Sequence, residues 1–144
     1  MTATRVTNVA WGKDRIVLRE IREQVFIVEQ GVPVELEWDG LDEAAEHFIA
    51  YFENKPAGCA RLINGNKIGR MAVLKQFRNQ GIGLKLLESI KRFASQKRVT
   101  RLTLSAQCHA YEFYLSAGFQ ASSIPYLDAG ITHIDMECRV FSLH

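Results

Sequence analysis

Two glycines separated by one residue stand where a predicted strand leads into a predicted helix, in the segment Arg78-Asn79-Gln80-Gly81-Ile82-Gly83. Glycine lets the backbone turn tightly and approach a ligand closely, and the free N–H groups at the start of a helix favour an anion. The segment is not a dinucleotide-binding fingerprint, because Leu86 stands at the third glycine position, and no Gly-Lys-Ser/Thr follows to make a Walker A loop. It therefore indicates a phosphate or pyrophosphate site, unless the glycines only serve the turn.

The three cysteines are weaker candidates for chemistry. Cys108 stands beside His109, but adjacent residues on an extended segment point in opposite directions, which argues against a thiol nucleophile with its base. Cys59 and Cys138 are expected to behave as small buried apolar side chains. The three are too few and too scattered for a disulfide framework or a CxxC metal site, so no metal is implied.

Apolar residues at helical spacing predict three helices around the glycine turn. Asp14 is expected to cap the first helix, which Gly31 ends. A strongly amphipathic helix follows Gly83, and a short helix spans 110–117. The stretch 35–46 is expected to be a loop with one helical turn.

Seven strands are predicted between and after these helices, over 5–10, 47–53, 57–63, 67–74, 99–106, 119–122 and 132–141. Asn64-Gly65-Asn66 joins two of them, and Asn-Gly between extended runs is a strong hairpin signal, so the three strands within 47–74 form an antiparallel meander. The strand–helix–strand unit of 67–106 is expected to be a right-handed parallel crossover. The class is α/β (α+β), with a mixed, mostly antiparallel sheet flanked by helices.

Length and charge restrict the remaining possibilities. The chain has 144 residues, which suits a single domain over 1–144, and its net charge of +2 is spread along the sequence. No basic arm indicates a nucleic-acid partner, no apolar run suits a membrane span, and residues 1–10 lack the apolar core of a signal peptide. We therefore expect a cytoplasmic protein, monomer or homodimer, that binds neither nucleic acid nor membrane.

Two motifs at a characteristic separation resemble the GCN5-related N-acetyltransferase (GNAT) family. They are Arg-x-x-Gly-x-Gly at 78–83 and, about thirty residues later, Ala110-x-x-Phe113-Tyr114-x-x-x-Gly118-Phe119. The predicted order of elements is that family's over the whole chain. The segments Val28-Glu29-Gln30-Gly31-Val32-Pro33, Asp39-Gly40-Leu41-Asp42-Glu43 and Gly130-Ile131-Thr132-His133 also resemble small, poorly characterised bacterial acyltransferases within it. The resemblance implies the GNAT fold, whose sheet splays between two parallel strands.

The resemblance also implies acetyl-CoA, or another acyl-CoA, as co-substrate. The pyrophosphate would be held by backbone amides of Arg78, Asn79, Gln80, Gly81, Ile82 and Gly83. The pantetheine arm would run along Met71, Ala72 and Val73 in the splay, and an amide near Val73 would polarise the thioester carbonyl. Gln107 stands where many members carry an Asn that contacts this arm, so the contact depends on Gln reaching the same partner.

Tyr114 matches the family's general acid, which would share a proton with the departing CoA thiolate. The alternative is a tyrosine that only packs in the core. Tyr111 is the other tyrosine of this helix, but its position does not match the motif.

A general base is also implied, because a protonated amine must lose a proton before it attacks. Glu29 and His133 are the better candidates, since the loop after the first helix and the last strands line the acceptor side in this fold. His47, His109 or a chain of water molecules are the alternatives.

One stretch between the first helix and the meander is acidic, with carboxylates at Glu35, Glu37, Asp39, Asp42, Glu43 and Glu46. It is either a solvated loop or the border of an acceptor cleft that attracts a cationic amine, with Trp38 stacking on that cation.

These features predict an enzyme, an acyl-CoA-dependent N-acyltransferase that moves an acetyl group directly to a primary amine. The acceptor is expected to be a small molecule, because no extended peptide-groove signature is present. Two alternatives from other classes stay open: a non-catalytic acyl-CoA-binding or sensing module, and an interaction domain whose glycine turn holds no ligand.

Overall fold

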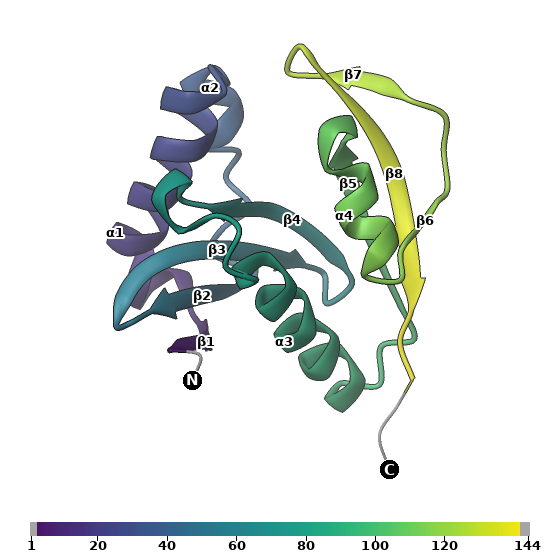
Figure 1. Ribbon diagram of the computed structural model, residues 1–144, viewed down its shortest axis with the longest axis horizontal. Coiled ribbons are helices and arrows are strands. Elements are labelled where there is room, and N and C mark those ends of the chain that lie inside the picture. The colour runs from purple at the N-terminus through teal and green to yellow at the C-terminus, as the bar shows by residue number, and fades with distance from the viewer. Residues whose placement is uncertain (1–2, 142–144) are drawn as a thin grey trace.

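Residues 3–141 are described by the computed structural model, in which eight strands form one sheet. In chain order they are β1 (Thr4–Val9), β2 (Glu46–Phe52), β3 (Lys55–Ile63), β4 (Lys67–Val73), β5 (Arg101–Gln107), β6 (Gln120–Ala121), β7 (Tyr126–Asp128) and β8 (Ile131–Arg139). Across the sheet the order is β1-β2-β3-β4-β5-β8-β6, and β7 pairs with β8. Every pairing is antiparallel except that of β4 with β5. The predicted mixed sheet is confirmed, with one more strand than predicted (Figure 1).

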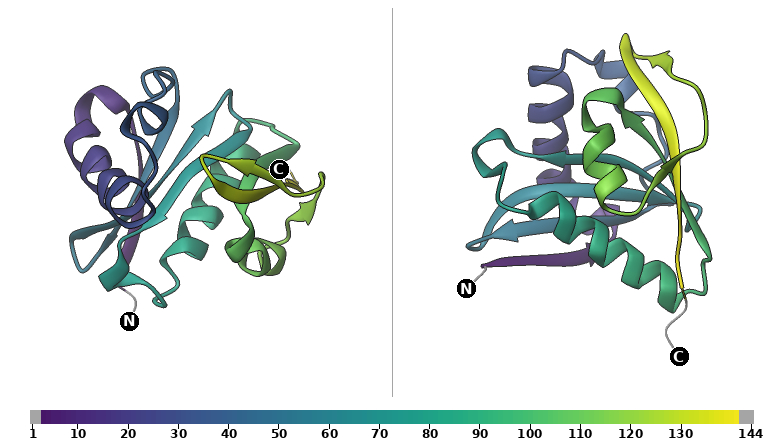
Figure 2. Two further views of the ribbon diagram at one scale, coloured as in Figure 1. Left: turned by 90° about the horizontal axis from the view of Figure 1, so that it is seen from above. Right: turned by 45° about the vertical axis from the view of Figure 1, so that its right-hand side comes forward.

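The helices are divided between the two faces of this sheet. α1 (Trp11–Arg22) continues into η1 (Glu23–Glu29), a π-helix, and the single turn α2 (Val34–Glu37) follows. α3 (Ile82–Gln96) connects β4 to β5, and α4 (Tyr111–Ser116) follows β5; the short 3-10 turns η2 (Lys75–Phe77) and η3 (Cys108–Ala110) precede them. Figure 2 shows α1 on one side of the sheet and α3 on the other.

Two apolar cores fix these helices. On one face, Leu18 and Ile21 of α1 are buried against β2, β3 and β4. On the other, α3 presents the predicted apolar face, and Leu86, Leu87 and Ile90 are fully buried against the sheet. Burial of apolar surface on both faces is the main stabilising contribution here. It fixes α1 and α3 against the sheet.

The first helix begins earlier than predicted, because Asp14 is not its N-cap. α1 begins at Trp11, and Asp14 lies inside it at a kink, with φ −116° and ψ 16°. The N-cap is Ala10, and no side chain caps the helix. The indole of Trp11 packs on the His47 ring at 5.2 Å between centroids, so tertiary packing sets the start of the helix rather than a capping hydrogen bond.

β4 separates from β5 after only two paired positions, Lys67 with Thr103 and Ile68 with Leu104. Over 69–73 the edge of β4 that would face β5 has no strand partner, while its other edge stays paired with β3. Figure 1 shows β5 and β8 turning away from the β1–β4 part of the sheet. This splay creates a gap beside the second half of β4.

β7 has no counterpart among the predicted strands. Its three residues, Tyr126 to Asp128, are all exposed and show no alternation of apolar and polar side chains. The Tyr126 hydroxyl donates to Asp135 Oδ1 at 2.5 Å and hydrogen-bonds Ser105, which ties β7 to β8 and β5. Side-chain hydrogen bonds, rather than an apolar pattern, therefore position the β7–β8 hairpin.

Candidate active site

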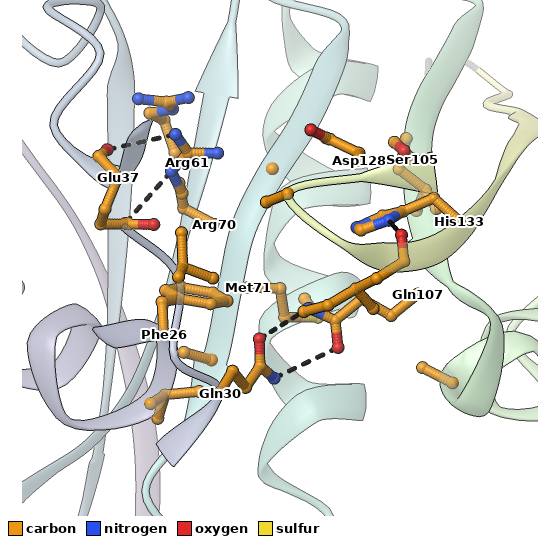
Figure 3. Close-up of a pocket in the computed structure, with 18 of the residues that line it drawn as sticks. Phe26, Gln30, Glu37, Arg61, Arg70, Met71, Ser105, Gln107, Asp128 and His133 are labelled. Carbon is orange, nitrogen blue, oxygen red and sulfur yellow. Dashed lines mark hydrogen bonds and ion pairs between the residues drawn. The ribbon is translucent and has the colours of Figure 1, made fainter. Parts of the chain in front are cut away.

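A cleft of about 820 Å³ occupies the splay between β4 and β5. Figure 3 shows its two walls, one carrying Phe26, Glu37, Arg61 and Arg70, and the other carrying Ser105, Gln107, Asp128 and His133. Of the thirteen predicted site residues, eight line the cleft, namely Glu29, Met71, Ala72, Val73, Arg78, Gln107, Tyr114 and His133. The other five, Asn79, Gln80, Gly81, Ile82 and Gly83, follow Arg78 along the chain and are not among the lining residues.

The predicted pyrophosphate segment leads from Arg78 into α3, which begins at Ile82. Asn79 and Gly81 both have left-handed backbone, with φ +63° and +78°, and Gly81 is the N-cap. No side chain caps α3, and the first helical hydrogen bond is from Lys85 N–H to Gly81 O, at 3.1 Å. The N–H groups that follow Gly81, including those of Ile82 and Gly83, have no intrahelical acceptor. They form a bare helix start that suits an anion.

The two glycines of this turn serve different purposes. Gly81 needs its positive φ, and a Cβ there would meet nothing within 4 Å. At Gly83 a Cβ would lie 3.1 Å from the ring of Phe113, so this glycine lets α4 pack against the start of α3. A structural reason therefore exists for both glycines, packing at Gly83 and backbone conformation at Gly81, and the open space at Gly81 also leaves room for a ligand.

Glu29 and Arg78 form a two-pronged ion pair across the end of the cleft, with both N···O distances 2.6 Å. Arg78 Nε also donates to the carbonyl oxygen of Val73, at 2.9 Å. The hydrogen bond from Arg78 lowers the pKa of Glu29. A lowered pKa weakens this carboxylate as a base, and its role as general base stays a prediction.

A reciprocal pair of amides also joins the two walls. Gln107 Nε2 donates to Gln30 Oε1 at 2.7 Å, and Gln30 Nε2 donates back to Gln107 Oε1 at 3.2 Å (Figure 3). Gln30 follows η1 and was not among the predicted site residues. Its one signal in the sequence is its place beside Glu29, since 77 residues separate it from Gln107.

Tyr114 lies with its hydroxyl inside the cleft and its ring in the core. The ring contacts those of Phe113 and Phe119, with centroids 5.1 and 6.0 Å away, and the hydroxyl donates to Met71 Sδ at 3.4 Å. Burial raises the pKa of Tyr114 to about 12, so the phenol keeps its proton at neutral pH and is a hydrogen-bond donor. Tyr111 packs against the core and does not line the cleft.

His133 presents one ring nitrogen as a possible proton acceptor. Its Nδ1 lies 2.7 Å from the carbonyl oxygen of Ile131. A carbonyl oxygen only accepts, so Nδ1 carries the proton and the neutral ring keeps its lone pair on Nε2. The Tyr126 ring stacks on the imidazole, with centroids 6.2 Å apart and planes 23° apart, which fixes its orientation.

The other histidines and the cysteines are placed less favourably for catalysis. His109 is the exception, because it lines the cleft and so stays an alternative base. His47 is fully buried on β2, where Nε2 meets the carbonyl oxygen of Asp42 at 2.9 Å and burial lowers its pKa, so it is a neutral core residue and not a base. Cys59 and Cys138 are buried, as predicted.

The acidic stretch forms an ion network with three arginines, so the interpretation as a solvated loop is wrong for its buried members, whereas Glu37 and Asp39 do border the cleft. Arg22, 1% exposed, donates to Glu37 at 2.8 Å and to Asp42 at 2.6 Å. Arg61 donates to Asp42 at 3.0 Å and to both oxygens of Asp39 at 2.9 Å. Glu37 and Asp42 are not solvated, and they are not free to attract a cation.

Arg70 and Trp38 complete this network. Arg70 lies 3.1 Å from Glu37 and 3.1 Å from Asp39. The indole of Trp38 lies under the guanidinium groups of Arg19 and Arg22, at 4.6 and 4.9 Å from the ring centroid. The cation that Trp38 stacks on is therefore the protein's own.

Two properties of the described residues bear on the type of site. Within residues 3–141, no three His, Cys, Asp or Glu side chains are grouped so that they could hold a metal ion. None of the helices described is long and apolar enough to cross a membrane.

Comparisons with known proteins agree with the geometry. The family model described as acetyltransferase (GNAT) domain matches residues 13–140. The chain is 37% identical over 120 residues to "Uncharacterized N-acetyltransferase YjcF" of Bacillus subtilis, covering 81% of this chain and 86% of that protein. The structure of an acyl-CoA N-acyltransferase from Pseudomonas aeruginosa matches with a TM-score of 0.81 and 30% identity over 94% of this chain and 99% of that one. Escherichia coli ElaA shares the fold, with a TM-score of 0.83 and 24% identity over 94% and 99%.

Proposed function

The chain belongs to the GNAT family of acyl-CoA N-acyltransferases, and from this premise we propose that it transfers an acetyl group from acetyl-CoA directly to a primary amine of a small molecule. The observation that supports this most is the cleft itself. It brings the unpaired edge of β4 and the protonated hydroxyl of Tyr114 together with Arg78, which the chain follows with the uncapped start of α3.

The donor side of the cleft is the part lined by Met71, Val73, Arg78, Gln107 and Tyr114. The free N–H groups after Gly81 would hold the pyrophosphate, with the helix dipole adding to the attraction. The edge of β4 would hydrogen-bond the pantetheine arm as a further strand would. The Val73 carbonyl already accepts from Arg78 Nε at 2.9 Å, and its second lone pair is left for an N–H donor from the cleft.

Tyr114 acts on the leaving group in this proposal. A thiol has a pKa near 8.5, well below the value of about 12 for this phenol. Tyr114 therefore acts as general acid by donating a strong hydrogen bond to the sulfur as the C–S bond breaks, with the proton remaining closer to the phenol oxygen. Nε2 of His133, or the carboxylate of Glu29, removes one proton from the substrate ammonium, which then attacks as the neutral amine.

Thermal unfolding with acetyl-CoA, CoA and ATP tests the donor site. A ligand at 100 times its Kd stabilises a protein by about 2.7 kcal/mol, so acetyl-CoA and CoA should raise Tm and ATP should not. Release of free thiol with a panel of amines then tests catalysis. Binding without turnover on any amine would favour the sensing module, and no binding would end the proposal. Cytoplasmic location, and assembly as monomer or homodimer, stay predictions.

A further inference from the structure

The part of the cleft beyond Met71 is separate from the donor side and has its own chemistry. We call it the acceptor chamber; Leu36, Glu37, Leu41 and Arg70 lie on one wall, and Asp128 and His133 lie on the other. Figure 3 shows Glu37 and Arg70 facing the wall that carries Asp128 and His133.

The first wall is charged but balanced, because its carboxylates already have arginine partners. Glu37 is bound by Arg22 and Arg70, and Asp39 is bound by Arg61 and Arg70. A ligand cation could take these carboxylates only by displacing a partly or fully buried arginine. The wall is therefore unsuited to a polycation, and its arginines are equally unavailable to an anion.

The opposite wall carries an unpaired carboxylate. Of the described carboxylates that line the cleft, Asp128 is the one without an ion pair, whereas Glu29, Glu37 and Asp39 each have an arginine. Asp128 pairs with Ile131 at the turn of the β7–β8 hairpin, which Tyr126 anchors. A single unpaired negative charge, on an exposed side chain at a backbone position set by the hairpin, thus shares a wall with His133.

The mouth of the chamber is apolar. Leu36 and Leu41 line the cleft, yet they are 50% and 49% exposed. They extend from α2 and from the turn after it, beside the balanced ion network. Large apolar side chains left in water at the rim of a cleft favour a ligand with an apolar body.

We propose that the acceptor is a primary amine with one positive charge on an apolar body, an inference that rests on the proposed function. Asp128 binds the ammonium, and Leu36 and Leu41 contact the body. His133 Nε2 takes one proton from the ammonium; the amine nitrogen then bonds to the thioester carbon, the C–S bond breaks, and the sulfur leaves as thiolate. The nitrogen's second proton passes to solvent, which leaves a neutral amide.

Matched pairs of amines test the class of acceptor with acetyl-CoA saturating. 2-Phenylethylamine differs from phenylalanine by a carboxylate, and hexylamine differs from 1,6-diaminohexane by a second ammonium. We expect kcat/KM to be at least tenfold higher for the first member of each pair. Lys67, an exposed cation that also lines the cleft, is the group that would reverse the first comparison.

Substitution of Asp128 tests the ammonium site. Asp128→Asn should raise KM for 2-phenylethylamine about tenfold with kcat within twofold, and the Tm shift with acetyl-CoA should be retained. Asp14→Asn, the same change on α1 outside the cleft, is the control and should leave both constants unchanged. Preferred use of phenylalanine or the diamine, or an unchanged KM in Asp128→Asn, would overturn the inference alone. A wild-type protein that binds no acetyl-CoA, or acylates no amine, would overturn it together with the proposed function.

Discussion

Most of the donor side of the cleft comes from one stretch of chain, to which β5 and α4 add Gln107 and Tyr114, whereas the acceptor chamber is assembled from several stretches. The edge of β4, Arg78 and the start of α3 all lie within 71–83 and offer mainly backbone groups. The chamber combines side chains of α2, β3, β4 and the β7–β8 hairpin, held by long-range ion pairs. A site that binds its ligand through backbone groups needs a fixed spacing of residues along the sequence. A site that binds through side chains needs only that the right residues meet in the folded structure.

The largest expected effect is a loss of CoA binding through a change at the donor side alone. Gly81→Glu should abolish CoA binding, because a carboxylate at the N-cap would take the free N–H groups that the pyrophosphate needs. Gly65→Glu is the matched control: it has a similar backbone, with φ +75°, and open space at Cβ, but it lies in the β3–β4 hairpin. Isothermal titration with CoA measures the loss. CoA binding by the Gly81→Glu variant would mean that the helix start is not the donor site.

The next largest effect is on the stability that the ion network beside the acceptor chamber provides. Arg22→Met should lower the free energy of unfolding by about 3 kcal/mol, because it leaves Glu37 and Asp42 buried with fewer partners. Arg15→Met, on the exposed face of the same helix, should change it by about 0.5 kcal/mol or less. Urea unfolding measures both. Equal losses in the two variants would show that the network contributes nothing beyond helix packing.

The same ion network should make the free energy of unfolding depend on pH. Burial alone would raise the pKa of Asp39, but hydrogen bonds from Arg61 and the Leu41 amide, with the charges of Arg61 and Arg70, lower it to about 2. A pKa lowered from 3.8 contributes about 2 kcal/mol of stability above pH 4, which is lost as the pH falls toward 2.

Asp39→Asn should therefore lower stability at pH 6 by about 2 kcal/mol and have much less effect near pH 2. Urea unfolding at several pH values gives the two curves. Glu43→Gln, at an exposed carboxylate of the same stretch, is the matched control. Parallel curves for wild type and Asp39→Asn would contradict the assignment of this stability to Asp39.

The same contrast explains what the sequence could predict. The glycine turn and the buried face of α3 follow from local spacing, and both are found as predicted. Arg22 shows no local sign of burial, since its carboxylate partners lie 15 and 20 residues away. Gln30 and Gln107 lie farther apart still, and the exposed strand β7 is fixed by the hydrogen bonds of Tyr126. Regular backbone was thus predictable, and partners brought together by the tertiary fold were not.

Where the two regions meet, Tyr114→Phe should lower kcat about tenfold or more and leave CoA affinity nearly unchanged. The hydroxyl is the only group removed, and its ring contacts with Phe113 and Phe119 remain. Tyr111→Phe, in the same helix but outside the cleft, is the control. Steady-state kinetics with 2-phenylethylamine measure both. Full activity of Tyr114→Phe across the pH range would remove the phenol from the mechanism.

The smallest expected effect concerns Gln30, whose amide pair with Gln107 closes the donor side. The pantetheine arm would fill the cleft, separate the two amides and exclude water. Each amide would then need a hydrogen-bond partner on the arm, because an unpaired buried amide is costly. Gln30→Leu should therefore weaken CoA binding about fivefold, as expected for one lost hydrogen bond. It should not change the affinity for 3′-phospho-ADP, which lacks the arm. Gln24→Leu, at an exposed position of the same π-helix, is the control. Tighter CoA binding by Gln30→Leu would instead make the amide pair a lock that the donor must open.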